Sequence, residues 1–216
     1  DVKKNGDKAI FKYTQKYDRI KLETDKICLK KITKSDFTND IDKKIFNSFK
    51  KSIKNVYNFH KKQLPKDYKH LNNKALLSSS WQALDSVGLY VPGGKAVYPS
   101  SLIMNVVPAI VAGVKRIVCT MPPDNKINPY ILALLYELRI KEIYLVGGAQ
   151  AIAALTYGTE TIKPVNKIFG PGNAFVASAK KQVFGKVGID LIAGPSEIIV
   201  VANNDNNPKW VASDLI

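Results

Sequence analysis

The sequence predicts an α/β protein whose main domain has three layers, a parallel sheet between two layers of helices. Apolar strand patterns alternate with helix patterns from Ser86 to Ala202. Single helices separate the strands, which implies parallel pairing with right-handed crossovers. Three apolar runs end in glycine-rich turns, VGLYVPGG, IYLVGGAQ and IFGPGN. Such turns bring helix N-termini close to negatively charged ligands, so we expect one ligand surface at the edge of one sheet.

The region before Ser86 is polar and has mainly helical patterns. The expected elements are helices over 9–17 and 41–59, a loop over 64–73 and a short strand over 81–83. Asp40 is the candidate N-cap of the second helix. We therefore expect residues 1–89 to be the N-terminal, incomplete part of another domain that is mainly helical.

The region after Ser86 contains the alternating elements. Strands are expected at 87–91, 115–120, 142–146, 166–169, 188–192 and 197–202, and helices at 102–113, 128–139, 149–157 and 173–184. Residues 90–201 therefore make one domain. Pro208 follows Asn207 as the first residue of a further helix, and the sequence ends inside that helix. Since residue 1 is also not Met, we expect a chain truncated at both ends, with 202–216 beginning the return to the first domain.

The composition is that of a globular protein with a large basic excess. The formal net charge is +15, and 45% of the 216 residues are hydrophobic. Nucleic acid is one interpretation of this charge. However, nearly all of it is lysine scattered along helices, and arginine, the usual specific reader of phosphate and guanine, occurs only at positions 19, 116 and 139. The pattern favours a solvated lysine-rich face over a nucleic-acid site. No apolar run reaches the roughly 18 residues of a membrane span.

The cysteines and histidines give weak signals. Cys28 and Cys119 cannot form a disulfide framework, so a reducing cytoplasm is the simpler interpretation. A nucleophilic role for Cys119 is disfavoured, because a buried strand cysteine is usually inert. His60 and His70 lack the spacing of paired metal ligands, which favours a surface role over metal binding.

Polar residues at the turns are the candidate site residues, although no turn has the G-x-G-x-x-G spacing. The Tyr90 ring could stack on a flat ligand, or it could be a core tyrosine. The Gln150 amide suits a ribose or a base edge, or it could cap a helix. Asn173 could bond a ligand, or it could be an ordinary N-cap. Ser196 and Glu197 could contact a ligand, or they could be a turn hydroxyl and a solvated acid.

The same segments carry a family resemblance. VGLYVPGG, PSSLIMNVVPAIVAGV, VGGAQAIAALTYGTE, KIFGPGN and AGPSEIIVVAN followed by VASDL resemble histidinol dehydrogenase in order and spacing. The earlier VKKNGDKAIFKYTQKYD resembles the N-terminal helical region of that family. The resemblance covers nearly the whole chain, and GGAQAIAAL and FGPGN match residue by residue.

The resemblance implies a Rossmann-like fold of the aldehyde-dehydrogenase kind and a four-electron oxidation of L-histidinol through an aldehyde to L-histidine. The cofactors would be NAD and zinc, and the enzyme a homodimer, without nucleic-acid or membrane partners. Tyr90, Gln150 and Asn173 match NAD-contacting positions, and Ser196 matches a substrate-contacting position. The zinc ligands and the Glu-His base of the family match nothing in this chain. We therefore expect it to hold no catalytic residue and no metal ligand, and to be inactive alone.

Two other kinds of function stay open on the sequence alone. The chain could be a non-catalytic remnant that binds NAD or, through its lysines, nucleic acid. It could also come from a relative that oxidises another amino alcohol or a sulfonated diol.

Overall fold

A five-stranded parallel sheet forms the centre of the molecule. The computed structural model describes residues 1–29, 31–93, 98–192 and 197–215. The strands are β3 (Ser86–Tyr90), β4 (Arg116–Thr120), β5 (Glu142–Tyr144), β6 (Lys167–Phe169) and β7 (Gly188–Ile189). Their order in the sheet is β5-β4-β3-β6-β7, and every neighbouring pair is parallel. The predicted α/β class with a parallel sheet is confirmed.

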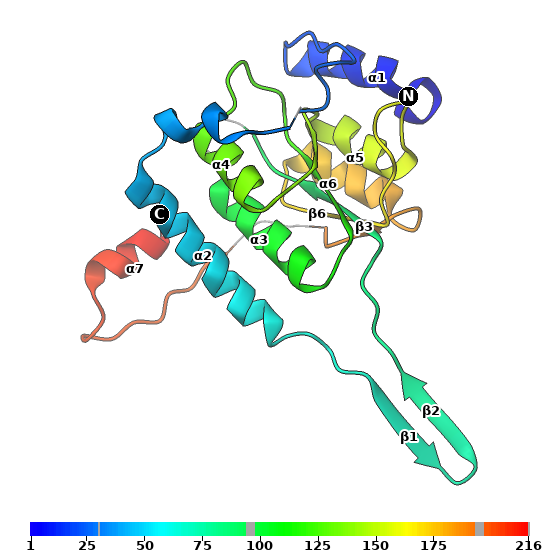
Figure 1. Ribbon diagram of the computed structural model, residues 1–216, viewed down its shortest axis with the longest axis vertical. Coiled ribbons are helices and arrows are strands. Elements are labelled where there is room, and N and C mark those ends of the chain that lie inside the picture. Colours follow the sequence, from blue (N-terminus) through cyan, green and yellow to red (C-terminus); the bar gives the residue numbers. More distant parts are fainter. Residues whose placement is uncertain (30, 94–97, 193–196, 216) are drawn as a thin grey trace.

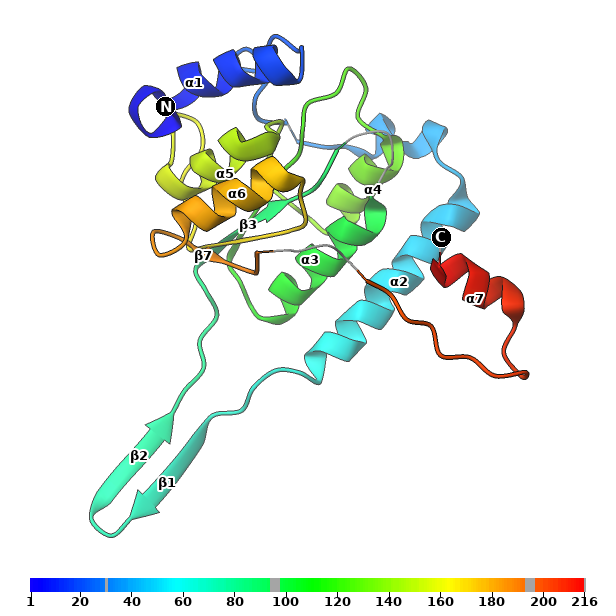
Figure 2. The same cartoon turned by 180° about the vertical axis from the view of Figure 1, so that it is seen from behind.

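Helices cover both faces of the sheet (Figure 1, Figure 2). One face carries α1 (Val2–Tyr17), α5 (Gly148–Tyr157) and α6 (Ala174–Val183), and the other carries α2 (Lys43–Lys61), α3 (Pro99–Val111) and α4 (Pro129–Glu137). Each face has its own hydrophobic cluster against the sheet. The two clusters give the three layers that the alternating pattern predicts.

The two N-terminal helices differ in how they are held. α1 packs on α5 with Ala9 and Ile10 fully buried, and the backbone N–H of Asp7 donates to Glu160 at 2.7 Å. α2 packs on α3 and begins after two short 3-10 helices, Lys34–Asp36 and Thr38–Asp40. Its N-cap is Asp42 rather than the predicted Asp40, because the Asp42 carboxylate accepts the N–H groups of the first turn.

A β-hairpin replaces the loop expected at 64–73, so that prediction was wrong. β1 (Tyr68–Asn72) and β2 (Ala75–Ser79) pair antiparallel and project away from the sheet (Figure 1). The strand expected at 81–83 is absent from this described region, because the strands pair earlier in the sequence. The hairpin buries neither face, so its sequence lacks the alternation of a half-buried strand.

The last part of the chain departs from expectation at two places. The strand predicted at 188–192 ends at Ile189, since the Asp190 carboxylate accepts the next backbone N–H, that of Leu191. The strand predicted at 197–202 was wrong. No described strand lies beside this segment, so its backbone lacks ladder partners. The predicted last helix is present as α7 (Pro208–Leu215).

Candidate functional site

The strand order places a switch point at the centre of the sheet. From β3 the chain moves to β4 and β5 on one side, and it then returns to β6 and β7 on the other side of β3. Open parallel sheets bind ligands beyond the carboxyl ends of their strands, at the point where the order reverses. In this molecule that point lies between β3 and β6. The turns after these two strands are the first and third glycine-rich turns of the sequence.

Close backbone contacts bring the three turns together. A Cβ at Gly170 would lie 2.1 Å from the backbone oxygen of Tyr90, so the turn after β6 presses against the end of β3. Gly170 also has a φ of +116°, which favours glycine. Gly93 and Gly147 both approach the Pro122 ring, so the turns after β3 and β5 flank the end of β4. The expectation that the turns share one edge of the sheet agrees with this geometry.

Tyr90 joins β3 to the helix after β5. Its side chain is only 4% exposed, and its hydroxyl accepts the backbone N–H of Gly148 at 3.1 Å. Burial raises the pKa of the Tyr90 phenol, and the nearby Asp18 carboxylate adds to this effect. The ring is therefore part of the core, which agrees with the second of the two interpretations of Tyr90, a core tyrosine. The hydroxyl keeps its hydrogen, and this hydrogen is the group that Tyr90 can offer to a ligand.

Gln150 lies in the first turn of the same helix, α5. It is 8% exposed, and its Oε1 lies where a Cβ on Gly148 would be 2.8 Å away. The amide is thus folded back over the N-terminus of α5, close to Gly148, whose backbone N–H bonds the Tyr90 hydroxyl. Tyr90 and Gln150 therefore meet at one helix N-terminus.

Asn173 is the N-cap of α6. Its Oδ1 accepts the backbone N–H groups of Phe175 and Val176, both at 3.1 Å. Asn173 therefore acts as an ordinary helix N-cap, which is one of its two predicted roles. Among the described residues the Nδ2 group has no acceptor, and the residue is exposed, so this group can donate to a ligand.

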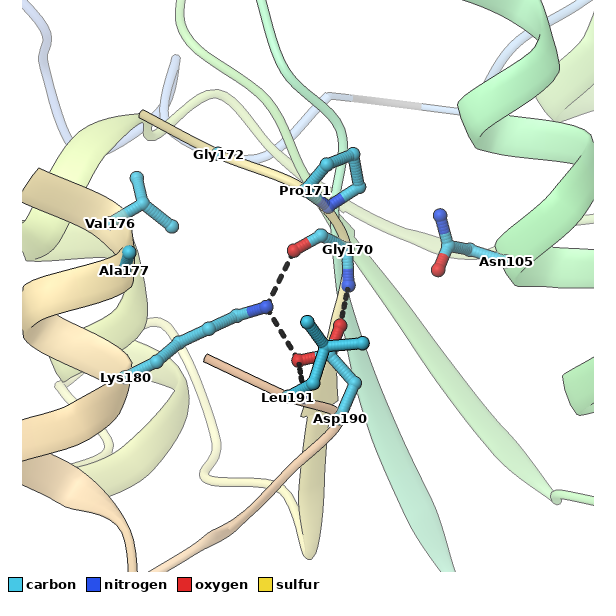
Figure 3. A pocket seen from close by; sticks show the side chains of 9 residues that line it. All are labelled: Asn105, Gly170, Pro171, Gly172, Val176, Ala177, Lys180, Asp190 and Leu191. Atoms are coloured by element: carbon cyan, nitrogen blue, oxygen red, sulfur yellow. Dashed lines mark hydrogen bonds and ion pairs between the residues drawn. The ribbon is translucent and has the colours of Figure 1, made fainter. Parts of the chain in front are cut away.

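A buried ion pair lies beneath the turn that precedes Asn173 (Figure 3). The Lys180 ammonium donates to the Gly170 carbonyl at 2.5 Å and to the Asp190 carboxylate at 2.7 Å. The other Asp190 oxygen accepts the Gly170 N–H at 2.9 Å. The pair borders a cavity of about 220 Å³, which Asn105 of α3 lines from the opposite side. Sequence reasoning missed both charges, because a lysine on a helix and an acid after a strand usually face solvent.

Asp18 is a second acid that sequence reasoning missed. It follows α1, and its buried Oδ2 finds no hydrogen-bond partner among the described residues. Desolvation raises the pKa of this carboxyl. Only its position after an apolar helix face could have indicated that it is partly buried.

Other predicted groups lie away from this edge or outside the described residues. Ser196 falls outside them, and Glu197 is exposed. His60 lies in the last turn of α2, and His70 lies on the hairpin. Burial raises the pKa of the Cys119 thiol to about 12, so it is a poor nucleophile near neutral pH.

Metal and membrane signals are both missing from the described part of the chain. Within it, no three His, Cys, Asp or Glu side chains gather in a way that could hold a metal ion. None of its helices combines the length and the apolar character that a bilayer crossing requires.

A parallel sheet with glycine-rich turns at its switch point is typical of the doubly wound α/β proteins, a class that binds nucleotides at this edge. A sequence model described as Histidinol dehydrogenase matches residues 1–216, and the chain belongs to that family.

The curated relatives agree with this assignment. Histidinol dehydrogenases of Brucella abortus (strain 2308) and Bacillus subtilis (strain 168) are 50% and 48% identical to the whole chain. The chain covers 50% and 51% of their lengths, so it spans about half the length of the curated relatives it matches. A crystal structure of histidinol dehydrogenase from Elizabethkingia anophelis superposes with a TM-score of 0.88 at 36% identity, over 100% of this chain and 50% of that one.

Proposed function

We propose that this chain is the NAD-binding part of a histidinol dehydrogenase. The enzyme would oxidise L-histidinol through L-histidinal to L-histidine, in the last steps of histidine biosynthesis. One observation carries the proposal. In a chain of this family, Tyr90 ends β3 and bonds the N-terminus of α5, and Gln150 lies in the first turn of that helix. Asn173 ends the turn whose first residue, Gly170, presses on Tyr90.

The residues at the switch point fit a dinucleotide. The Tyr90 hydroxyl hydrogen and the Gln150 amide can bond ribose hydroxyls, and the Asn173 amide can donate to a carbonyl or phosphate oxygen. The N-termini of α5 and α6 favour the negative pyrophosphate. Bound NAD would supply the acceptor for the hydride that leaves the substrate carbon. This chain's own contribution is to bind and orient the dinucleotide.

Zinc does not fit the described residues in the same way, because they offer no cluster of metal ligands. We therefore assign no step of the reaction on this chain to zinc. We also propose that the 216-residue chain, assayed alone with zinc, does not form NADH from histidinol. A zinc requirement of the whole enzyme, a homodimer, a substrate contact at Ser196 and a cytoplasmic location stay predictions that rest on the resemblance.

The direct test is calorimetric titration of the chain with NAD. The informative variant is Asn173→Ser, because serine is also a good N-cap but lacks the amide. We expect it to bind NAD about two- to tenfold more weakly, the value of one lost hydrogen bond. Asn128→Ser is the matched control. Asn128 caps α4 on the other face by accepting the N–H of Tyr130, and its replacement should leave NAD affinity unchanged.

Tyr90→Phe tests the hydroxyl in the same titration, with Tyr144→Phe as its control. The Tyr144 hydroxyl contacts the Thr161 carbonyl rather than a helix N-terminus. A chain that binds no NAD, but binds random duplex DNA with a steep dependence on salt, would replace this proposal with the nucleic-acid alternative.

The activity is tested in a chimera. Residues 1–216 replace the matching half of the Bacillus subtilis relative, in a strain that lacks its own histidinol dehydrogenase. Growth without added histidine, with NADH formation by the purified chimera, would support the proposal. A folded chimera that binds NAD but oxidises only another alcohol would reject histidinol as the substrate.

A further inference from the structure

Lys180 and Asp190 hold the backbone of one residue from both sides. The Gly170 carbonyl accepts from the Lys180 ammonium at 2.5 Å, and the Gly170 N–H donates to Asp190 at 2.9 Å. The two charges also contact each other at 2.7 Å. All three residues come from different elements, since Gly170 follows β6, Lys180 lies in α6 and Asp190 follows β7. Figure 3 shows the two side chains converging on this glycine.

The Lys180–Asp190 pair contributes little net free energy to the stability of the fold. Lys180 is only 4% exposed, and lysine is almost never buried unless it is paired. Removing two charges from water costs about as much as their attraction returns, so an apolar pair of similar volume is often equally stable. Global stability therefore does not explain why charges stand here. What an apolar pair could not do is bond both backbone groups of Gly170.

Gly170 needs such bonds because it begins the turn that leads to Asn173. Its φ of +116° lies in a region where glycine moves freely, and it is the first residue of the Gly170–Asn173 turn. Asn173 ends this turn and begins α6, the helix that carries Lys180. The lysine thus ties the last turn of α6 back to the residue that starts the Gly170–Asn173 turn. Asp190 fixes the same residue to the end of β7, and the backbone N–H of Asp190 donates to Ile168 at 3.1 Å.

We propose that Lys180 and Asp190 are positioning residues for NAD, an inference that rests on the proposed function. They hold the Gly170–Asn173 turn against the end of β3, which keeps the Asn173 amide beside the switch point between β3 and β6. Neither charge touches the dinucleotide. Loss of either charge would weaken NAD binding, because the turn would no longer be held in the geometry that binds NAD. The conformational entropy lost on ordering the turn would then reduce the affinity.

The opposite end of the sheet offers a matched control. Arg116 and Glu142 stand at the starts of β4 and β5 and form two bonds of 2.8 Å each. This pair is also partly buried, and Arg116 also donates to two backbone carbonyls, those of Pro164 and Lys163. It touches no glycine-rich turn. Its loss should therefore affect stability but not the affinity of the folded chain for NAD.

The experiment compares stability and NAD affinity across four variants of the chain. Lys180→Met and Asp190→Leu each leave one buried charge unpaired, so both should unfold at lower urea concentrations than the unmodified chain. The double variant Lys180→Met with Asp190→Leu removes both charges and should recover much of the urea midpoint. Its dissociation constant for NAD should nevertheless stay roughly ten- to a hundredfold weaker than that of the unmodified chain. Arg116→Met should lower the midpoint and bind NAD within about twofold of the unmodified chain.

Recovery of NAD affinity together with stability in the double variant would overturn the inference, because a merely structural pair would behave in that way. Equal NAD affinity in all folded variants would overturn it as well, while leaving the proposed function intact. If the unmodified chain binds no NAD at all, both the inference and the proposed function fail. If either single variant does not fold, the comparison of the double variant with Arg116→Met still decides the question.

Discussion

The sheet domain and the outer segments of this chain contain the same residue types in opposite surroundings. In the sheet domain, β3 to β7 with α3 to α6, Leu155 and Ile168 are fully buried. In the outer segments, which are the hairpin (68–79) and residues 197–215, Leu76 is 62% and Ile199 is 88% exposed. An apolar residue is therefore buried only where the chain itself provides a partner for it.

The comparison explains why the two regions differ in predictability. An apolar run pairs as a strand when neighbouring strands can bond its backbone on both edges, as β4 and β6 do for β3. Residues 197–201 have a similarly apolar pattern, but no described strand lies next to them. Substitutions should therefore have large effects in the sheet domain and small effects in the outer segments.

The largest effect is expected at Gly170. An alanine there would have a disfavoured φ and a Cβ 2.1 Å from the Tyr90 oxygen. We expect Gly170→Ala to lower the free energy of unfolding by about 2 to 6 kcal/mol, from strain and overpacking together. Gly185→Ala is the control. Gly185 also has a positive φ, +91°, but open space around its Cβ position. Its replacement should cost only the strain, about 1 to 2 kcal/mol. Equal urea unfolding curves for the two variants would contradict the close contact.

The next largest effect is the loss of a core side chain. Ile168→Ala removes a fully buried side chain from the centre of the sheet and should cost about 2 to 5 kcal/mol. Ile199→Ala removes the same atoms from an exposed segment and should change stability by less than about 0.5 kcal/mol. Urea unfolding of both variants measures the difference. A large loss in Ile199→Ala would show that this segment packs in solution.

How much the sequence could predict depends on the same division. The strands from β3 to β6 lie where the pattern placed them, because their apolar runs face a core on both sides. The three glycine-rich turns also share an edge, as expected. The hairpin was missed because it buries neither face. The Lys180–Asp190 pair was missed because one charge lies in α6 and the other follows β7, and only tertiary packing brings them together.

The pH dependence of stability that comes from the two cysteines is a smaller effect, and it should differ between the buried Cys119 and the partly buried Cys28. Burial raises the pKa of the Cys119 thiol to about 12, while the unfolded thiol titrates near its ordinary pKa of 9.0. Above pH 9 the unfolded state therefore binds fewer protons, and stability falls by up to about 1.4 kcal/mol per pH unit until the pKa of the folded thiol is reached. Cys119→Ala should remove this part of the slope.

Cys28 is the partly exposed counterpart. Desolvation raises the pKa of the Cys28 thiol as well, but this side chain is only partly buried, whereas Cys119 is fully buried. Cys28→Ala should therefore flatten the pH dependence less than Cys119→Ala does. Urea midpoints from pH 8 to pH 11 give both slopes, with the unmodified chain as the reference for lysine and tyrosine titration. A larger change in Cys28→Ala would mean that the outer cysteine is the more deeply buried one in solution.

The smallest effect is expected on the hairpin. Leu76 belongs to β2 and its side chain is exposed, so Leu76→Ser should change the free energy of unfolding by less than about 0.5 kcal/mol. Leu89→Ser, the same change in β3, buries a hydroxyl in the core and should cost several times more. Urea unfolding compares the two at several protein concentrations. If Leu76→Ser costs as much as Leu89→Ser, and the cost grows with concentration, the hairpin must be buried against another molecule. The contrast between the sheet domain and this outer segment would then hold only for the isolated chain.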